Sequence, residues 1–387
     1  MRVWSKRLFI AYLLTSPYYL FPSGGLQIST AFLVLAITTA AISVLSHKDR
    51  FKVIRELTEQ NRYLLIFVVL ASLINIIYYC LFGDLKFITS SLYFIINFSA
   101  ILMFLIVAND KKFLQTIKIS LEINLFLQLT ICAVGLSRYH PTDTYRLMGT
   151  FNDPNQLAFY VFLGLLFIYI INILHKSKTS KIDWAAIAIG LTLIILSSST
   201  GVLLGIAVFV ILLGITKGKK FLERFKKSVS IVIVAGGIIA GTGVVILSTY
   251  LDNIGINVPI ISRIKNKTAE SDGRNILEDR GLDTVVYYPE YLIYGSGEGD
   301  YSRFPKQKNG GNEIHSSLIA LLFYYGIIPV VFLLKWLYDI TRKLDWSIKI
   351  AFIAILIESF TLINYRQPLL WPLLILPLAQ SKLAKRS

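Results

Sequence analysis

Long apolar runs separated by short polar connections make up most of the chain. Twelve of these runs, each 15 to 23 residues long, are apolar enough to be interpreted as membrane-spanning helices. A helix needs about 20 such residues to cross the hydrocarbon core of a bilayer. The pattern predicts an all-α integral membrane protein, a single polytopic domain over 1–387 with about 12 transmembrane helices. The predicted spans are 8–22, 26–46, 63–82, 87–108, 114–136, 155–174, 182–198, 201–216, 228–248, 313–334, 348–364 and 367–381.

One polar interruption is much longer than the others. Residues 249–312 form a stretch of 64 residues without an apolar run long enough to cross a bilayer. Long connections between packed helices are uncommon unless they have a function, and binding sites concentrate on loops carried by a rigid scaffold. We therefore expect 249–312 to be a functional loop carrying short helices.

Composition supports a membrane protein and excludes a soluble one. The chain is 55% hydrophobic and 16% charged, with a mean hydropathy of +0.63. The net charge of +16 would by itself suggest a nucleic-acid-binding protein, and its distribution decides against that class. With the N-terminus inside, 27 of the 39 Lys and Arg residues fall on the inner side of the predicted spans.

The remaining basic residues complete a positive-inside pattern. The long loop holds eight of them beside nine Asp and Glu, and the short outer connections hold four: Lys86, Arg138, Arg146 and Arg366. The sequence thus predicts a multi-pass protein of the cytoplasmic (inner) membrane, with both termini in the cytoplasm. The connection 138–154 and the long loop 249–312 then share the outer, extracytoplasmic face.

The connection 138–154 combines an arginine with the start of a helix. Asp153 precedes Pro154, a pattern typical of an N-cap followed by proline at the first helical position. A helix N-terminus attracts anions, and Arg146 could add a bidentate contact to a phosphate. We interpret Arg146 as a candidate diphosphate ligand. Asn152, Asp153 and Asn155 are either substrate contacts or residues that only start the helix.

The long loop supplies further candidates. Arg263, Arg274 and Arg280 are possible diphosphate or substrate ligands, and Glu298 lies in the glycine-rich segment YGSGEGD. This segment resembles a phosphate-binding loop only superficially, because no Lys-Ser/Thr follows it and no strand–helix unit frames it. No nucleotide cofactor is expected. No metal site is expected either, since the two cysteines lie in predicted spans and no metal motif is present.

His315 is the candidate catalytic residue. It begins the predicted span 313–334 on the outer side, two residues after Glu313, a further possible substrate ligand. A histidine here could accept a proton from a hydroxyl group, or it could be only an interfacial hydrogen-bonding residue. Pro329 predicts a kink in the same span.

Three blocks of sequence, in this order, resemble the bacterial O-antigen ligase and polysaccharide repeat-unit polymerase superfamily. They are YRLMGTFNDPNQLAFYVFLGLL, SDGRNILEDRGLDTVVYYPEYLIYGSGEG and GNEIHSSLIALLFYYGIIP. The resemblance implies a metal-independent membrane glycosyltransferase. Its donor would be an oligosaccharide on undecaprenyl diphosphate, with no cofactor, and a chain-length regulator and a flippase as further partners.

The resemblance also implies roles for individual residues. Arg146 and Arg274 would hold the diphosphate, and His315 would assist the acceptor hydroxyl. The family often has an arginine where this chain has Thr200, so Arg280 or Arg263 would supply that charge. The expected function is polymerisation of repeat units into O-antigen or capsular or exopolysaccharide. An O-antigen ligase acting on lipid A-core is the alternative within the same chemistry, and a lipid-linked oligosaccharide flippase or transporter is the alternative from another class.

Overall fold

The computed structural model describes residues 2–21, 27–108, 110–143, 145–222, 280–305 and 313–381. Three predictions therefore lie outside the described residues: the span 228–248, and the candidate ligands Arg263 and Arg274. Of the predicted loop 249–312, the structure describes 280–305.

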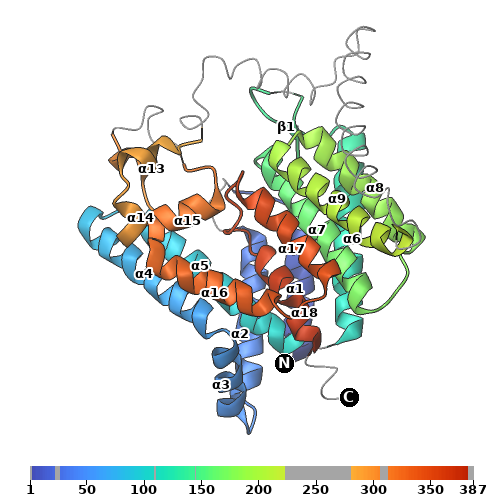
Figure 1. The fold of residues 1–387 in the computed structure, drawn as a ribbon. Coiled ribbons are helices and arrows are strands. Elements are labelled where there is room, and N and C mark those ends of the chain that lie inside the picture. The colour runs from blue at the N-terminus through green and yellow to red at the C-terminus, as the bar shows by residue number, and fades with distance from the viewer. Residues whose placement is uncertain are drawn as a thin grey trace.

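The described chain is predominantly helical (Figure 1). Its first half contains α1 (Arg2–Thr15), α2 (Ile28–Leu45), α3 (Arg50–Gln60), α4 (Arg62–Phe82), α5 (Leu85–Val107), α6 (Lys111–Ala133), β1 (Arg138–Tyr139), β2 (Leu147–Gly149) and α7 (Pro154–Leu174). Its second half contains α8 (Lys181–Ser197), α9 (Thr200–Leu222), α13 (Asp283–Tyr287), α14 (Tyr291–Tyr294), the 3₁₀ turn η2 (Tyr301–Arg303), α15 (Ser317–Tyr325), α16 (Ile327–Thr341), α17 (Trp346–Ser359) and α18 (Leu370–Ser381).

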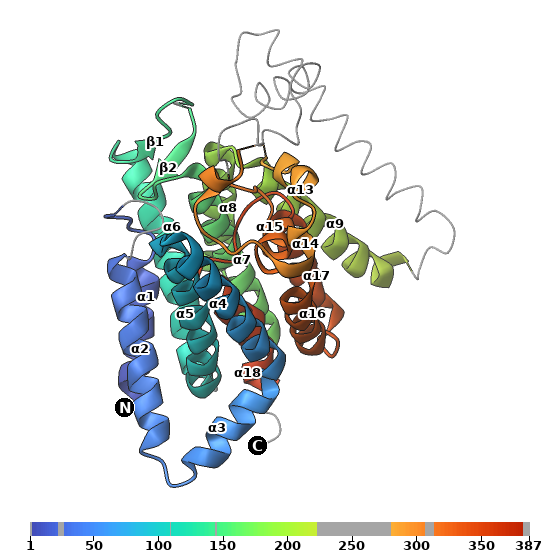
Figure 2. The ribbon, with the colours of Figure 1, turned by 90° about the vertical axis from the view of Figure 1, so that its left-hand side faces the viewer.

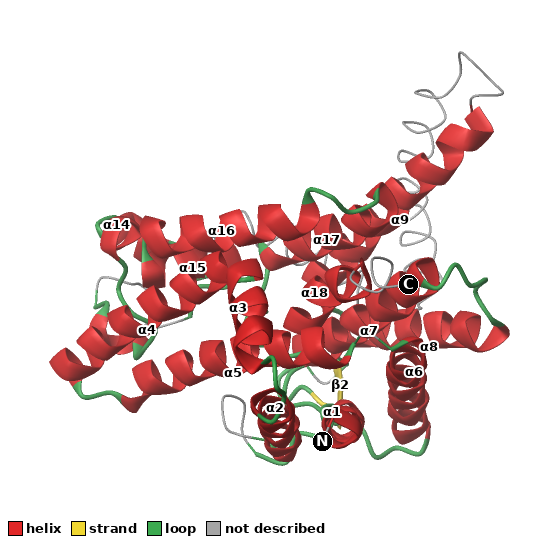
Figure 3. Ribbon diagram, turned by 90° about the horizontal axis from the view of Figure 1, so that it is seen from below, coloured by secondary structure: helices red, strands yellow, loops and turns green. Residues whose placement is uncertain are grey.

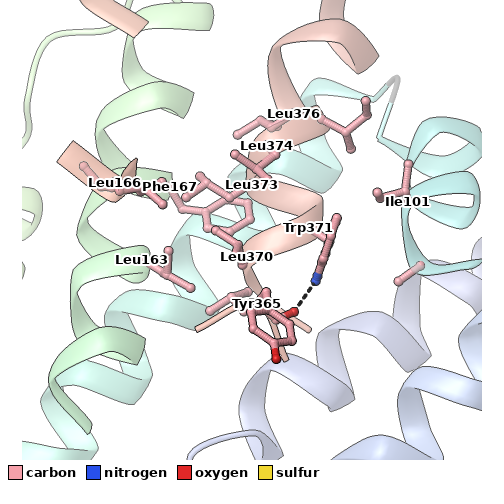
Figure 4. Packing of buried hydrophobic residues seen from close by; sticks show 14 of the residues in the cluster. Ile101, Leu163, Leu166, Phe167, Tyr365, Leu370, Trp371, Leu373, Leu374 and Leu376 are labelled. Atoms are coloured by element: carbon pink, nitrogen blue, oxygen red, sulfur yellow. Dashed lines mark hydrogen bonds between the residues drawn. The ribbon is translucent and has the colours of Figure 1, made fainter. Parts of the chain in front are cut away.

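Within the described residues, five helices are long and apolar enough to cross a membrane: α2, α4, α5, α6 and α7. This finding supports the prediction of a helical membrane protein. Helix α7 is the most enclosed of the five. In its most apolar stretch of 18 residues, 78% of the residues are buried, against 28% in α2 and α4. It packs against α6, α8, α9, α17 and α18. Figure 4 shows Leu163 and Phe167 of α7 facing Leu370 and Leu373 of α18.

Helices α1, α2 and α6 run between two ends of the molecule, whereas α4, α9 and α16 are strongly tilted (Figures 1 and 3). Helix α1 begins and α18 ends at one end, where α3 also lies, and β1 and α13 lie at the other (Figures 1 and 2). We call these the terminus end and the loop end. Seen from below, α1, α2 and α6 appear nearly end-on, so they share a common direction (Figure 3).

The predicted span 313–334 is divided into two helices. Helix α15 ends at Gly326, whose φ of +73° is a left-handed conformation that favours glycine, and α16 then begins at Ile327. The break therefore does not fall at Pro329, where the kink was predicted. Pro329 lies in the first turn of α16, where a proline costs little because its missing N–H would have no helical partner.

The predicted cap of α7 is confirmed. The Asp153 side chain accepts hydrogen bonds from the backbone N–H groups of Asn155 at 2.7 Å and Gln156 at 3.3 Å. Pro154 occupies the first helical position. The preceding connection is not wholly irregular, because β1 and β2 form an antiparallel pair. This pair carries the chain from α6 to the start of α7 at the loop end.

Candidate functional site

A buried carboxylate, Glu298, anchors a polar network at the loop end. Its side chain is only 2% exposed, and Arg366 donates to Glu298 Oε1 from Nε at 2.7 Å. The hydroxyl of Tyr365 donates to the same oxygen at 2.7 Å, and the hydroxyl of Tyr325 donates to Oε2. The Glu298 backbone N–H is bound by Asn75 Oδ1 of α4 at 2.8 Å. A buried charge is tolerated when it is paired in this way.

The network continues outward from Arg366 to the second predicted carboxylate. Arg366 Nη2 lies 2.6 Å from Glu313 Oε1, and the Tyr301 hydroxyl donates to that oxygen at 2.7 Å. The side chains of Arg366 and Glu313 are 32% and 28% exposed. One guanidinium thus joins a buried carboxylate to a half-exposed one. The group Glu298, Tyr301, Glu313 and Arg366 is called the arginine network below.

The glycine-rich segment serves this network as a close-packed turn. A Cβ atom at Gly299 would lie 2.3 Å from the Phe87 ring, and one at Gly295 would lie 2.7 Å from the Tyr324 carbonyl oxygen. Gly297 has a φ of +67°, and a Cβ there would come within 2.9 Å of the Tyr78 ring. The glycines therefore let the chain pass between α4, α5 and α15 and deliver Glu298 to the interior.

His315 lies next to this network and is exposed. Its backbone N–H donates to the Arg280 carbonyl oxygen at 2.9 Å, so the predicted candidates Arg280 and His315 are neighbours through the main chain. On the other side of His315, the Ser317 hydroxyl bonds the Leu362 carbonyl and Asn364 Oδ1, each at 2.7 Å. The imidazole is thus carried by a segment that is fixed on both sides.

The candidates of the 138–154 connection form a second group. Arg146 is 4% exposed, and it donates from Nε to the Ser197 carbonyl at 3.2 Å and from Nη2 to Asn155 Oδ1 at 3.1 Å. Asn152 accepts from Arg138 and donates to the Phe21 carbonyl, each at 2.8 Å. These contacts, with the helix cap at Asp153, give each predicted residue of this connection a structural role.

A close backbone approach lies between the two groups. A Cβ atom at Gly201, just after the Ser197 turn, would meet Thr361 Oγ1 at 2.0 Å and Leu362 at 3.5 Å. Leu362 in turn accepts the hydrogen bond from Ser317. The Arg146 group and the His315 segment are therefore connected through the turns that follow α8 and α17.

The electrostatics of the arginine network keep Arg366 positively charged. Burial opposes the positive charge on Arg366, but Glu298, together with Tyr365 and Glu313, raises the pKa of that guanidinium well above its ordinary value. Burial is also the main cause of the raised pKa of the Tyr301 hydroxyl. Tyr301 therefore remains a protonated hydrogen-bond donor, while Arg366 remains a cation at any physiological pH.

A separate polar cluster lies toward the terminus end. Lys118 Nζ of α6 lies 2.6 Å from Asp183 Oδ1 and 2.9 Å from Asn172 Oδ1, so it joins α6 to α8 and α7. Glu122 is 3.9 Å from the same ammonium, and its Oε1 atom is buried without a hydrogen-bond partner. This cluster therefore sets two carboxylates around one ammonium, and Asp183 is the nearer of the two.

The sequence reasoning did not select Arg366 and Tyr301. Arg366 could have been selected for the same reason as Arg146. Both are arginines in predicted outer connections, where the positive-inside pattern does not require them. Tyr301 carried no such signal. Its position depends on how the loop folds back onto α15, which the local sequence does not specify.

The described residues contain no group of three or more His, Cys, Asp or Glu side chains that could hold a metal ion. The site is instead built from arginines, carboxylates, tyrosine hydroxyls and one imidazole. No protein-family model matches the chain. A search of curated proteins likewise gives no match.

Proposed function

We propose that the protein is a membrane glycosyltransferase that polymerises undecaprenyl-diphosphate-linked oligosaccharide repeat units. In this proposal the chain crosses the cytoplasmic membrane about 12 times, and the loop end faces outward. The product is an O-antigen or a capsular or exopolysaccharide. The observation that carries the proposal is the convergence of Arg280, Glu298, Glu313 and His315 in one region of the loop end, supported by Arg366.

The proposed chemistry uses the residue types present there. The sugar diphosphate is already a good leaving group, and arginines stabilise the charge that develops on it. His315, which is exposed, accepts a proton from the acceptor hydroxyl. The bond from the anomeric carbon to the diphosphate oxygen breaks, and a bond to the acceptor oxygen forms. The lipid diphosphate leaves with the electron pair of the broken bond and therefore carries the negative charge.

Within the proposal, the arginine network holds the segment that carries the base. Arg366 is bound by two carboxylates, so it is not free to take up a phosphate without exchanging a partner. The proposal keeps the diphosphate with Arg146, Arg274 and Arg280, as the sequence suggested. Arg146, which is buried, would exchange its contact with Asn155 for one with a phosphate oxygen. Arg366 fixes Glu313 two residues before His315.

Deletion of the gene, followed by a glycan-length profile, tests the proposal. A polymerase is expected to leave a single repeat unit attached in place of the ladder. Polymer of normal length stranded on the lipid carrier would instead identify a ligase. Failure of lipid-linked repeats to reach the outer face would identify a flippase and contradict the transferase proposal.

A transporter is the second candidate, because one observation favours it. The Lys118–Glu122–Asp183 cluster places ionisable groups within helices, and such residues in membrane proteins often serve transport. Lys118→Met with Glu122→Gln and Asp183→Asn removes all three charges of the cluster without leaving an unpaired one. A transferase would retain polymer formation in this triple variant, whereas a transporter would lose delivery of repeat units.

A further inference from the structure

An apolar groove lies between α15, α16, α17 and α18. Its volume is about 350 Å³. A water molecule takes up about 30 Å³ and a methylene group is of similar size, so the groove has room for a chain of about twelve methylene groups. Aliphatic and aromatic side chains make up most of its lining, among them Leu321, Leu333, Phe352, Ile353, Leu356 and Trp371. Such a lining offers water few hydrogen-bond partners, so we expect an apolar occupant.

The groove reaches the molecular surface. Leu334, Leu356 and Tyr338, which line it, are 47%, 43% and 59% exposed. Its inner wall is firm, because the Trp371 indole N–H donates to the Tyr365 carbonyl at 2.8 Å, as Figure 4 shows. An occupant can therefore enter sideways from the surrounding hydrocarbon without unfolding the wall behind it.

The two ends of the groove differ in charge. Ser317, Ser359 and Asn364 line the end near the loop end of the molecule, and all three are neutral. Lys349 and Thr341 line the other end, where α16 ends and α17 begins. Exposed Arg342 in the same turn lies 3.6 Å from Asp339, which also pairs with Lys335, so Lys349 is the cation that lines this end of the groove. The groove is therefore apolar along its length and basic at one end.

Its length corresponds to one leaflet of a bilayer. Lys349 and Ser359 are ten residues apart on α17, which at about 1.5 Å per residue is about 15 Å. Half of a hydrocarbon core of about 30 Å is the same length. Trp346 and Tyr338 are exposed beside the basic end, as aromatic residues commonly are at a membrane interface.

We propose that this groove binds one acyl chain of an anionic phospholipid, whose phosphate lies against Lys349. The chain fills the apolar length and the headgroup meets the basic end, so the ligand complements the site in both shape and charge. The positive-inside pattern assigns that end to the cytoplasmic leaflet. This inference does not depend on the transferase proposal, because it concerns a bound membrane lipid and not the glycan donor.

Photolabelling of the full chain in nanodiscs tests the proposal. The probe is phosphatidylglycerol with a diazirine at mid-chain, and labelled peptides are mapped by mass spectrometry. Label is expected on α16, α17 and α18. Unlabelled phosphatidylglycerol should compete about tenfold better than phosphatidylcholine, the scale of one charge-assisted contact. Equal competition by the two lipids would overturn the proposal.

Three variants locate the site. Ile353→Trp fills the groove and should abolish the label. Leu356→Trp does the same from the exposed edge, in case the first variant does not fold. Lys349→Gln should retain the label but remove the preference for phosphatidylglycerol.

A second apolar groove provides the matched control. It has a volume of about 240 Å³, and its lining, which includes Ala41 and Leu102, contains no charged side chain. Ala41→Phe should leave the label on α16–α18 unchanged. Label that survives Ile353→Trp and Leu356→Trp would refute the site. Competition by a polyprenyl diphosphate but not by phosphatidylglycerol would also overturn the proposal and assign the groove to the donor's tail.

Discussion

At the scale of single residues, the two carboxylates bound to Arg366 differ in burial. Glu298 is enclosed and receives hydrogen bonds from Tyr325, Tyr365 and Arg366, whereas Glu313 shares the same arginine from a half-exposed position. A buried partner can be removed only at the cost of leaving the other charge unpaired. A half-exposed partner is replaced by water at little cost.

This difference predicts unequal effects of two similar substitutions. Glu298→Gln should lower the free energy of unfolding by about 1–3 kcal/mol, because Arg366 loses its buried counter-charge and keeps only Glu313. Glu313→Gln, the matched control, should cost less than about 1 kcal/mol. Thermal unfolding in detergent measures both changes. Equal losses in the two variants would contradict the assignment of Glu298 as the anchor.

His315 gives a second prediction at the residue scale. If its imidazole accepts the proton of the acceptor hydroxyl, a side chain that cannot take up that proton should lose turnover. His315→Gln should therefore lower turnover by about 10²–10⁴. Turnover of lipid-linked repeat units by the purified protein measures this loss. Near-wild-type turnover of His315→Gln would rule out a role as the base and would mean that His315 only forms hydrogen bonds.

At the scale of elements, the glycine turn explains why Glu298 reaches the interior. The chain at Gly299 touches the Phe87 ring, so a methyl group there must displace an aromatic side chain of α5. Gly214 in α9 offers the opposite case, since it is exposed and no described atom outside its own helix lies within 4 Å of its Cβ position. Gly299 is therefore a packing constraint, whereas Gly214 is not.

We expect Gly299→Ala to destabilise the protein by about 1–3 kcal/mol, the usual cost of overpacking. Gly214→Ala should be neutral or stabilising by up to about 1 kcal/mol, because alanine favours a helix. Chemical or thermal unfolding compares the two variants. A neutral Gly299→Ala would mean that Phe87 moves freely and that the turn is not a packing constraint.

The sequence predicted elements better than it predicted their contacts. Apolar run lengths and the Asp153–Pro154 cap specify helices locally, so most predicted boundaries within the described residues, and the start of α7, agree with helix boundaries in the structure. The first predicted span, 8–22, is wrong, because the helix there is Arg2–Thr15. The break at Gly326 was missed, because glycine within an apolar run is read as packing unless its backbone conformation is known. Arg366 was missed because its partners Glu298 and Glu313 lie far away in the chain.

At the scale of the whole molecule, the start of α1, the end of α18 and α3 lie at the terminus end, and the 280–305 elements lie at the loop end (Figures 1 and 2). The proposed topology has an even number of crossings, with the terminus end in the cytoplasm as the positive-inside pattern predicts. In that proposed orientation the arginine network and His315 face outward, where a lipid-linked glycan is presented in the proposed reaction.

Cysteine labelling tests that orientation directly. In a background without Cys80 and Cys132, a cysteine at exposed Ser302 should react with a membrane-impermeant thiol reagent in intact cells. A cysteine at exposed Lys343, in the turn between α16 and α17, should react only after the membrane is opened. Both positions are solvent-accessible, so the comparison reports sidedness and not burial. The reverse labelling would place His315 in the cytoplasm, and the transferase proposal would then lose access to its donor.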